Sequence, residues 1–596
     1  MLSPDARQVA TEILRPPVGY TLDRTIMTSY SLDLEVVLAL PLAVLAQSDQ
    51  GVEELLQDPL LLLEALREAS DRVHIFVDES GIALPHVQRE LYAALEGSVH
   101  PVRAPNKGAF HPKLWVARFT REGDDDPLLR VAVASRNLTF DRSWDVALVS
   151  EARPGQQTEP GSQPLTDFLQ QLPKLGRQPL NNGLADALEG LADELGQTRF
   201  PGPEGFDGGI DFQVLGLGTS TGSLWRPVPS ADRVLAVAPF VNRSGLDALT
   251  ESGAGSLSLI SREEALEELP EGTLTPWQEV QVLQEAALEE PDDDTAGRPA
   301  GLHAKLIVAE HGNQVYWHVG SANLTRAAFN GRNVEIMARL RGKVGSTEVE
   351  RGVGIDSFRA GFDKLCTPFQ SVEAPVEEGE NEELRSLERT RDALLDCDLR
   401  VCCEAYDKEW DWWLAGELPD SEGVVIDVWP VTLPSNQART WPATLKWRLS
   451  IEQLTAFVAF RLRKGEDVEP LTLVAKLPAR GLPEQRMRRI LRKVIRTPER
   501  FLAFLRALLG GLDELVDWVS DRKVDPDSVK QSRAPEAETL LEDLLRTAAH
   551  DPERLAVVRQ VVTDLMADEE DSQVVPQKFR AIWQAMDAAL QKEPHS

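Results

Sequence analysis

Two short motifs in this sequence combine residue types that can transfer a phosphoryl group. The first reads AFHPKLWV and the second GLHAKLIV, so each has a histidine two residues before a lysine. Residues i and i+2 of a strand point to the same face, so His111 with Lys113, and His303 with Lys305, can each reach one point in space. A neutral imidazole is a nucleophile, a protonated one is a general acid, and lysine binds anionic oxygens.

Each motif is followed by an apolar, strand-like segment that ends in a Ser-x-Asn turn. After the turn, Leu-Thr and then an acidic residue recur in the same order in both copies. Amide side chains bind anionic oxygens, and a carboxylate that accepts from one imidazole nitrogen fixes the tautomer. We therefore predict a catalytic set of His111, Lys113, Asn137, His303, Lys305 and Asn323, supported by Ser135, Asp145, Ser321 and Glu335.

This set predicts phosphoryl transfer with no metal ion and no cofactor. One neutral histidine attacks phosphorus and forms a covalent phosphohistidine. The other histidine, protonated, gives its proton to the leaving oxygen. Because lysines and asparagines offset the charge of the transition state, a metal cation is not required. The four cysteines are irregularly spaced and predict free thiols rather than a metal site.

The two H-x-K…S-x-N copies resemble the motifs of the phospholipase D superfamily over roughly residues 25–365. Members of that family place two α/β lobes about a pseudo-twofold axis, with both motifs in one site. The resemblance therefore implies a phosphodiesterase with one composite site in a single chain. It also implies His111 as the nucleophile and His303 as the general acid, with the reverse assignment left open.

The sequence departs from the family pattern in three places. The family's aspartate, five residues after the lysine, is replaced by Arg118 in the first copy and by Glu310 in the second. The glycine before the serine is present as Gly320 but replaced by Ala134 in the first copy. The first copy also has a longer spacing between histidine and asparagine. These changes leave the histidines, lysines and asparagines in place.

Alternation of strand-like and helix-like segments predicts two α/β lobes, which are related by an internal repeat of about 190 residues. The expected strands include 28–34, 73–77, 114–119, 129–134 and 146–149, then 234–241, 257–261, 306–309, 315–319 and 334–340, with a helix over 34–46. The predicted fold class is α/β: two pseudo-symmetric phospholipase D-like lobes at 1–165 and 166–372, then a β-containing domain at 384–480 and a helical domain at 481–596.

The overall charge argues against nucleic-acid binding by the whole surface, but not by a local groove. The chain has 63 Lys and Arg against 96 Asp and Glu, a net charge of −33, whereas phosphate backbones need basic surface. One segment, 476–500, has nine basic and two acidic residues. We predict that one face of a helix there contacts nucleic acid, with a solvated or self-paired helix as the alternative: Arg488, Arg489, Arg492, Lys493 and Arg496.

Context favours a nuclease among the activities that this resemblance allows. The sequence shows no secretory signal and no apolar run of membrane-spanning length, which predicts a cytoplasmic protein with no membrane partner. The layout resembles stand-alone nucleases of bacterial antiviral defence. That resemblance implies DNA rather than RNA as the substrate, and a helicase or ATPase subunit as a partner, since this chain has no G-x-x-x-x-G-K-[ST] loop. A lipid phosphodiesterase and a non-catalytic binding scaffold are the alternatives.

Overall fold

The computed structural model describes most of the chain up to residue 505 and one helix near the C-terminus. The described ranges are 13–45, 71–370, 382–505 and 575–590, with internal gaps at 122, 140–141, 219–223, 284–299, 346–351, 421–422, 466–467, 496, 499 and 503, and a few isolated positions elsewhere. Most of the predicted helical domain at 481–596, and Arg496 with it, therefore lies outside the described residues.

A six-stranded mixed sheet forms the first lobe. Its strand order is β3-β2-β1-β4-β5-β7, in which β1, β2 and β3 are parallel and the remaining strands are antiparallel to their neighbours. The strands are β1 (Thr21–Ser29), β2 (Val73–Asp78), β3 (Val99–Val102), β4 (Leu114–Arg121), β5 (Asp124–Ala134) and β7 (Ala147–Ala152).

The second lobe repeats this plan in an eight-stranded sheet of order β16-β11-β10-β9-β13-β14-β15-β8. Strands β9, β10 and β11 are parallel, and β13, β14 and β15 follow as an antiparallel meander. The strands are β8 (Asp211–Leu215), β9 (Arg233–Val237), β10 (Ser256–Ser261), β11 (Glu279–Leu283), β13 (Leu306–His311), β14 (Gln314–Gly320), β15 (Glu335–Lys343) and β16 (Cys366–Pro368). The fold is therefore a duplicated α/β unit, as predicted.

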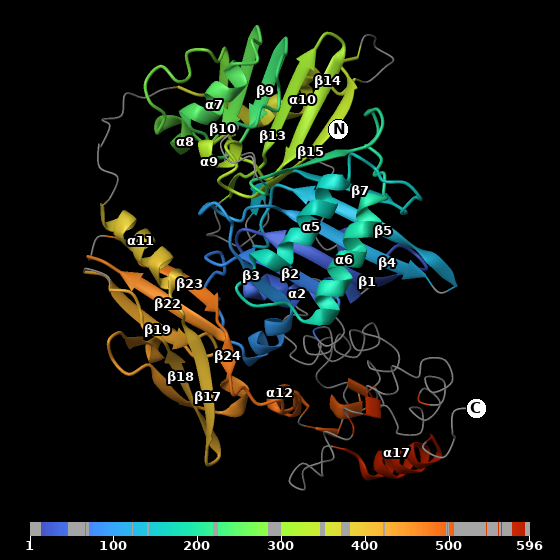
Figure 1. Ribbon diagram of the computed structural model, residues 1–596, viewed down its shortest axis with the longest axis vertical. Coiled ribbons are helices and arrows are strands. Elements are labelled where there is room, and N and C mark those ends of the chain that lie inside the picture. Colours follow the sequence, from blue (N-terminus) through green and yellow to red (C-terminus); the bar gives the residue numbers. More distant parts are fainter. Residues whose placement is uncertain are drawn as a thin grey trace, which may run out of the picture.

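Helices cover both sheets, and the two lobes lie against each other along one boundary (Figure 1). The helix α5 spans the predicted domain boundary at 165 and α6 lies beyond it, yet both pack against the first lobe: Phe168 of α5 stacks on Phe110 at 6.3 Å, and Glu194 of α6 pairs with Arg118 of β4. The helices of the two lobes are α2 (Leu34–Leu45), η1 (Glu90–Gly97), α5 (Gln163–Leu175), α6 (Asn182–Gly196), α7 (Arg243–Thr250), α8 (Glu263–Glu267), α9 (Arg326–Phe329), α10 (Ile355–Phe362) and η3 (Asp363–Leu365).

One strand expectation was wrong. The alternating segment 28–34 is not a single strand, because Ser29 ends β1, Leu32 forms isolated bridges, and Leu34 begins α2. The strand lies earlier, over Thr21–Ser29, and includes the charged residue Asp23. That charge is tolerated because Asp23 pairs with Arg118 of the neighbouring strand at 2.9 Å.

The C-terminal part begins with α11 and continues as two four-stranded sheets, in agreement with the predicted β-containing region. Their orders are β21-β18-β17-β24 and β20-β19-β22-β23. The elements are α11 (Glu382–Asp396), β17 (Arg400–Tyr406), β18 (Glu409–Ala415), β19 (Val425–Pro430), η4 (Ser435–Gln437), β20 (Arg439–Thr440), β21 (Lys446–Leu449), η5 (Ile451–Gln453), β22 (Phe457–Arg463), β23 (Leu471–Lys476), β24 (Ala479–Arg480), α12 (Arg486–Val494) and α17 (Gln577–Leu590).

Two further observations concern the described residues only. None of the helices there is both long enough and apolar enough to cross a bilayer. The four cysteines are free thiols, as their spacing predicts.

Candidate active site

The two lobes exchange short backbone ladders, and these ladders lead directly into the motif histidines. Strand β12 (Ala300–Leu302) of the second lobe pairs in parallel with β6 (Arg142–Trp144) of the first. The His303 backbone N–H donates to the Trp144 carbonyl at 3.0 Å. On the other side, Phe110 bridges to Val334, and the His111 N–H donates to the Val334 carbonyl at 2.9 Å. Each histidine is thus placed beside the acidic residue of the other lobe.

The first histidine is held by the acid of the second copy. His111 Nδ1 lies 2.8 Å from Glu335 Oε2, and the Glu335 side chain is fully buried. Ser321 Oγ donates to the same oxygen at 2.5 Å, and Asn333 Nδ2 donates to the other oxygen at 3.2 Å. Because a carboxylate accepts, Nδ1 of His111 carries the proton, and the lone pair of Nε2 is left for attack on phosphorus.

The second histidine repeats this arrangement with the acid of the first copy. His303 Nδ1 lies 3.0 Å from Asp145 Oδ1, and Ser135 Oγ donates to the same oxygen at 3.0 Å. No residue of the described chain bonds to the other oxygen of Asp145, which is buried. The two pairs are therefore crossed between the lobes, and Ser135 and Ser321 fix the acids rather than face a substrate.

Both motif lysines are buried between these pairs. Lys113 and Lys305 are 0% and 1% exposed, and each ammonium donates to the carbonyl of the histidine two residues before it, at 3.0 and 2.8 Å. Lys305 Nζ also lies 3.4 Å from the Ser135 carbonyl of the first lobe. Because a buried ammonium group favours a nearby negative charge, the two lysines can together hold an anion between the lobes.

Burial dominates the electrostatics of the site. It lowers the pKa of His111 to about 4, opposed by the charge of Glu335 and reinforced by both lysines. It also lowers the pKa of His303, with Lys305 and Lys113 acting in the same direction and Asp145 against it. The pKa of Lys113 falls well below its usual value, and that of Lys305 falls to about 7. Since each group responds to charges of the other lobe, the two motifs form one site.

The two asparagines differ in their contacts. Asn137 Oδ1 accepts from the Ser31 backbone N–H at 3.3 Å, which leaves its amide nitrogen for an anion. Asn323 Oδ1 is buried, and no partner for it occurs among the described residues. Both side chains come from the turns that follow β5 and β14, so the sequence order of the motifs places them at the same end of the two sheets as the histidines.

The two residues that stand where the family has aspartate, Arg118 and Glu310, have their partners outside this site. Arg118 pairs with Asp23 and Glu194, and so ties β4 to α6. Glu310 accepts from the Ile355 backbone N–H at 2.7 Å, at the beginning of α10, and pairs with Arg233 at 3.1 Å. The position that holds aspartate in the family thus holds each lobe's sheet to a helix and takes no part in the chemistry.

The basic segment of the C-terminal part is not brought to this site. Figure 1 shows α12 beneath the first lobe, on the side away from the second lobe. Its Lys493 pairs with Glu90 at 2.6 Å, and Arg486 pairs with Glu96 at 2.7 Å. Pairing with the protein's own acids, the alternative reading of this segment, thus accounts for part of its charge. Arg488 and Arg489 are exposed on the same helix, and Arg492 is half-buried.

Sequence reasoning missed several residues around the site. Asn333 was missed although it stands two residues before Glu335, and it holds both that acid and the Ala109 backbone N–H. Tyr30 was missed because it follows β1, about 80 residues before the motif, yet its ring lies 5.3 Å from that of His111. No local pattern marks such residues, since only the sheet topology brings them near the motifs.

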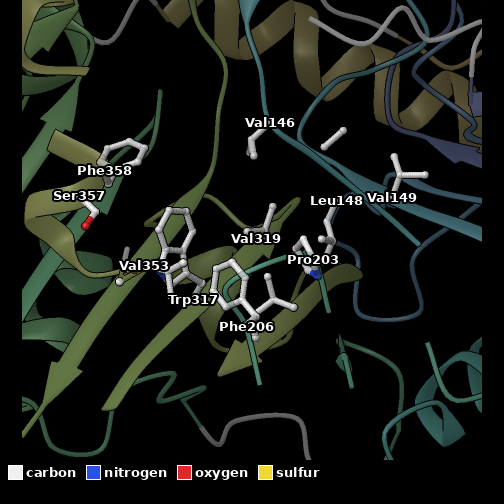
Figure 2. Close-up of a pocket in the computed structure, with 13 residues that line it drawn as sticks. Val146, Leu148, Val149, Pro203, Phe206, Trp317, Val319, Val353, Ser357 and Phe358 are labelled. Atoms are coloured by element: carbon white, nitrogen blue, oxygen red, sulfur yellow. Dashed lines mark hydrogen bonds between the residues drawn. The ribbon is translucent and has the colours of Figure 1, made fainter. Parts of the chain in front are cut away.

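Other features of the described residues do not point to a second chemistry. No cluster of three histidine, cysteine or acidic side chains suited to a metal ion occurs among them. An apolar cavity of about 250 Å³ lies where the lobes meet, and it contains none of the motif side chains. Figure 2 shows Leu148, Phe206, Trp317 and Val319 around this cavity.

The duplicated sheets, with an H-x-K strand entry and a Ser-x-Asn turn in each, meet in one site, so the fold is phospholipase D-like. No protein-family model and no curated protein matches the chain. Among solved structures, yeast tyrosyl-DNA phosphodiesterase is similar with 12% identity and a TM-score of 0.34, over 58% of this chain and 88% of that one.

A mutant of the same yeast enzyme gives 10% identity and a TM-score of 0.34, over 57% of this chain and 86% of that one. Polyphosphate kinase from Porphyromonas gingivalis gives 12% identity and a TM-score of 0.29, over 60% of this chain and 50% of that one. Likeness at this level assigns no activity, and the chemistry of the site rests on its own side chains.

Proposed function

We propose that this chain is a metal-independent phosphodiesterase that hydrolyses nucleic acid through a covalent phosphohistidine. The observation that carries the proposal is the crossed arrangement of two histidine–acid pairs over two buried lysines. Such a site binds a phosphodiester anion between the ammonium groups and presents an imidazole nitrogen from each lobe.

The first step transfers the phosphoryl group to His111. Its pKa of about 4 keeps the imidazole neutral near pH 7, so the Nε2 lone pair forms a bond to phosphorus. The bond from phosphorus to the leaving oxygen breaks, and protonated His303 gives its Nε2 proton to that oxygen. The bound diester anion favours the charged forms of His303 and the lysines, which offsets the effect of burial.

The second step releases the product. His303, now neutral, takes a proton from water, and the water oxygen forms a bond to phosphorus. The bond between phosphorus and His111 breaks, and the electron pair returns to Nε2. The products are an alcohol and a phosphomonoester, and both histidines regain their starting protonation states. Glu335 and Asp145 hold the tautomers throughout, because each accepts from an Nδ1.

Nucleic acid is the diester that we propose, because basic side chains stand on the segments that carry the site residues, in an otherwise acidic protein. Lys107 and Arg332 are exposed on the segments that precede His111 and Glu335, and Arg332 donates to the Lys107 carbonyl at 3.3 Å. Arg262 lies beside His303. A local basic rim attracts a polyanion despite a net charge of −33. Preference for DNA, a role in antiviral defence, and a helicase-type partner remain predictions from the sequence resemblance.

The proposal is tested with labelled single- and double-stranded DNA and RNA, each incubated with the purified chain in excess EDTA. We expect cleavage of at least one of these, lost in His111→Ala and in His303→Ala. His86→Ala, at an exposed position outside the site, serves as the control and should cleave normally. Cleavage that requires a divalent cation, or that persists in both site variants, would contradict the proposal.

A further inference from the structure

The two lobes carry opposite charges at equivalent positions beside the site. The strand registers show which residues of the two lobes are equivalent. Met27 of β1 pairs with Ile75 of β2, and Ala236 of β9 pairs with Leu259 of β10. On their other side, Met27 pairs with Trp115 and Ala236 pairs with Ile307. Each of these partners stands two positions after a motif lysine. Three residues beyond Ile75 is Asp78, and three residues beyond Leu259 is Arg262.

Both of these residues hold the segment that precedes the motif histidine, but they do so with opposite polarity. Asp78 Oδ2 accepts from the Phe110 backbone N–H at 2.7 Å, immediately before His111. Arg262 Nε donates to the Leu302 carbonyl at 2.8 Å, immediately before His303. The first lobe therefore presents a buried carboxylate at its side of the site, and the second lobe presents a guanidinium.

Arg262 has capacity for a further ligand. Its Nε is used by Leu302, and within the part of the chain that the structure describes neither Nη atom has an acceptor. The bond to Leu302 holds the guanidinium next to His303, and its charge lowers the pKa of Lys305. A phosphate on the second-lobe side of the site can therefore meet two N–H groups of Arg262.

An exposed aromatic ring lies against this arginine. Phe240 is 49% exposed, and the Arg262 guanidinium carbon is 5.2 Å from its ring centroid. The loop that carries Phe240 is fixed at the site, because Val241 bridges to Leu324 and the Asn242 N–H donates to the Leu324 carbonyl at 2.9 Å. Leu324 directly follows Asn323. The ring therefore stands between the segments that carry His303 and Asn323.

Among its described residues, the first lobe shows no such pair of side chains at its side of the site. Tyr30 lies against the His111 ring and is half-buried, and Asp78 also accepts from the Ser80 hydroxyl at 2.6 Å. An exposed phenyl ring with an adjacent cation suits a planar aromatic group joined to a phosphate. Exposure of Phe240 has a solvation cost that such a ligand would remove. The asymmetry therefore gives the two sides of the scissile phosphate different partners.

We propose that Phe240 and Arg262 form a nucleotide subsite on the second-lobe side, in which an unpaired nucleobase stacks on Phe240 and its phosphate binds Arg262. The proposal rests on the proposed function, and it specifies single-stranded nucleic acid, because a base within a duplex has no free face for the ring. Stacking of one base on an aromatic side chain changes affinity by about 5- to 150-fold.

The first test compares two chromogenic diesters, thymidine 5′-(p-nitrophenyl phosphate) and methyl p-nitrophenyl phosphate, in EDTA. We expect Phe240→Ala to lower kcat/KM for the nucleoside diester about 10-fold and to leave the methyl diester unchanged. Phe240→Trp should retain the activity, since indole also stacks. Tyr406→Ala is the matched control, because Tyr406 is 54% exposed and stacks on Arg448 at 3.6 Å in the C-terminal part, away from the site. Equal losses on both diesters, or no loss, would overturn the subsite.

The second test is independent of turnover. Binding of a fluorescent single-stranded oligonucleotide is measured by anisotropy in the His111→Ala background, with and without Phe240→Ala. We expect the second substitution to weaken binding about 10-fold, with a smaller effect on a duplex of the same sequence. If the unmodified chain hydrolyses neither diester, the proposed function fails while this measurement still decides the subsite. Unchanged binding to the single strand would overturn it.

Discussion

At the scale of single residues, burial of charge is the feature that makes the site work and limits it. Lys305 is almost fully enclosed, and desolvation lowers its pKa to about 7, so its charge is present below that pH and lost above it. His111 is neutral above a pKa of about 4 for the same physical reason. The proposed mechanism needs neutral His111 together with protonated His303 and charged Lys305, and burial lowers the pKa of His303 as well, so these requirements define a window of pH.

We therefore expect kcat/KM for a small diester to rise through about pH 4 and to fall on the basic side, because His303, whose pKa burial lowers, and Lys305, whose pKa is about 7, both lose their protons there. These pKa values apply because kcat/KM reports the free protein. Lys305→Arg keeps a charge at all accessible pH values. The part of the fall that Lys305 causes, near pH 7, should then disappear from whatever activity this variant retains, while the part that His303 causes should stay. A fall near pH 7 that is unchanged in the arginine variant would assign it to another group.

At the scale of elements, the crossed ladders between the lobes set the histidine positions, and the two backbones approach closely at Gly108. A Cβ atom at this residue would lie 2.2 Å from the Arg332 carbonyl oxygen and 2.5 Å from its carbon, both of which are backbone atoms. Phe110, two residues later, forms the bridge to Val334 that precedes Glu335. The His111–Glu335 pair thus depends on a contact that no side chain can enter.

We expect Gly108→Ala to separate the two backbones, to lower the free energy of unfolding by about 1–3 kcal/mol, and to reduce kcat at least 10-fold. Gly190→Ala in α6 is the matched control, because nothing lies within 4 Å of its Cβ position. That change should stabilise the helix by about 0.5–1 kcal/mol. Denaturant unfolding and initial rates measure both effects. Normal stability and activity in Gly108→Ala would show that the ladder does not position His111.

The same ladders show which parts of the fold and the site could not be predicted from the sequence. The strands that flank the motifs, β4, β5, β13 and β14, were predictable together with the motifs, because apolar alternation and the i, i+2 spacing of His111 and Lys113 are local signals. The exchange of acids between copies was not, because β6 and β12 have three residues each and no pattern of their own. Arg262 was also hidden, since only the register of β9 and β10 places it beside His303.

At the scale of the whole molecule, the C-terminal part shares a core with the first lobe. Apolar residues of both belong to one buried cluster, which includes Leu95 of η1 and Phe457 of β22. Glu96 lies at this junction, with its side chain 12% exposed. It accepts from the Ala456 backbone N–H at 2.8 Å and from Arg486 at 2.7 Å. The carboxylate is therefore the polar centre of a contact that is otherwise apolar.

We expect Glu96→Ala to destabilise the chain by about 3–5 kcal/mol, because it leaves the buried guanidinium of Arg486 without its carboxylate. Glu90→Ala is the matched control on the same short helix. It removes the ion pair with Lys493, whose side chain is 44% exposed, and an exposed pair contributes at most about 1 kcal/mol. Denaturant unfolding measures both variants, followed by tryptophan fluorescence, to which the C-terminal sheets and the lobes both contribute, and by activity, which reports the lobes alone. If the C-terminal part is only loosely attached, Glu96→Ala will behave like Glu90→Ala, and part of the fluorescence change will occur at denaturant concentrations that leave activity intact. If the shared core couples the parts, the two signals will shift together to lower denaturant in Glu96→Ala and hardly move in Glu90→Ala.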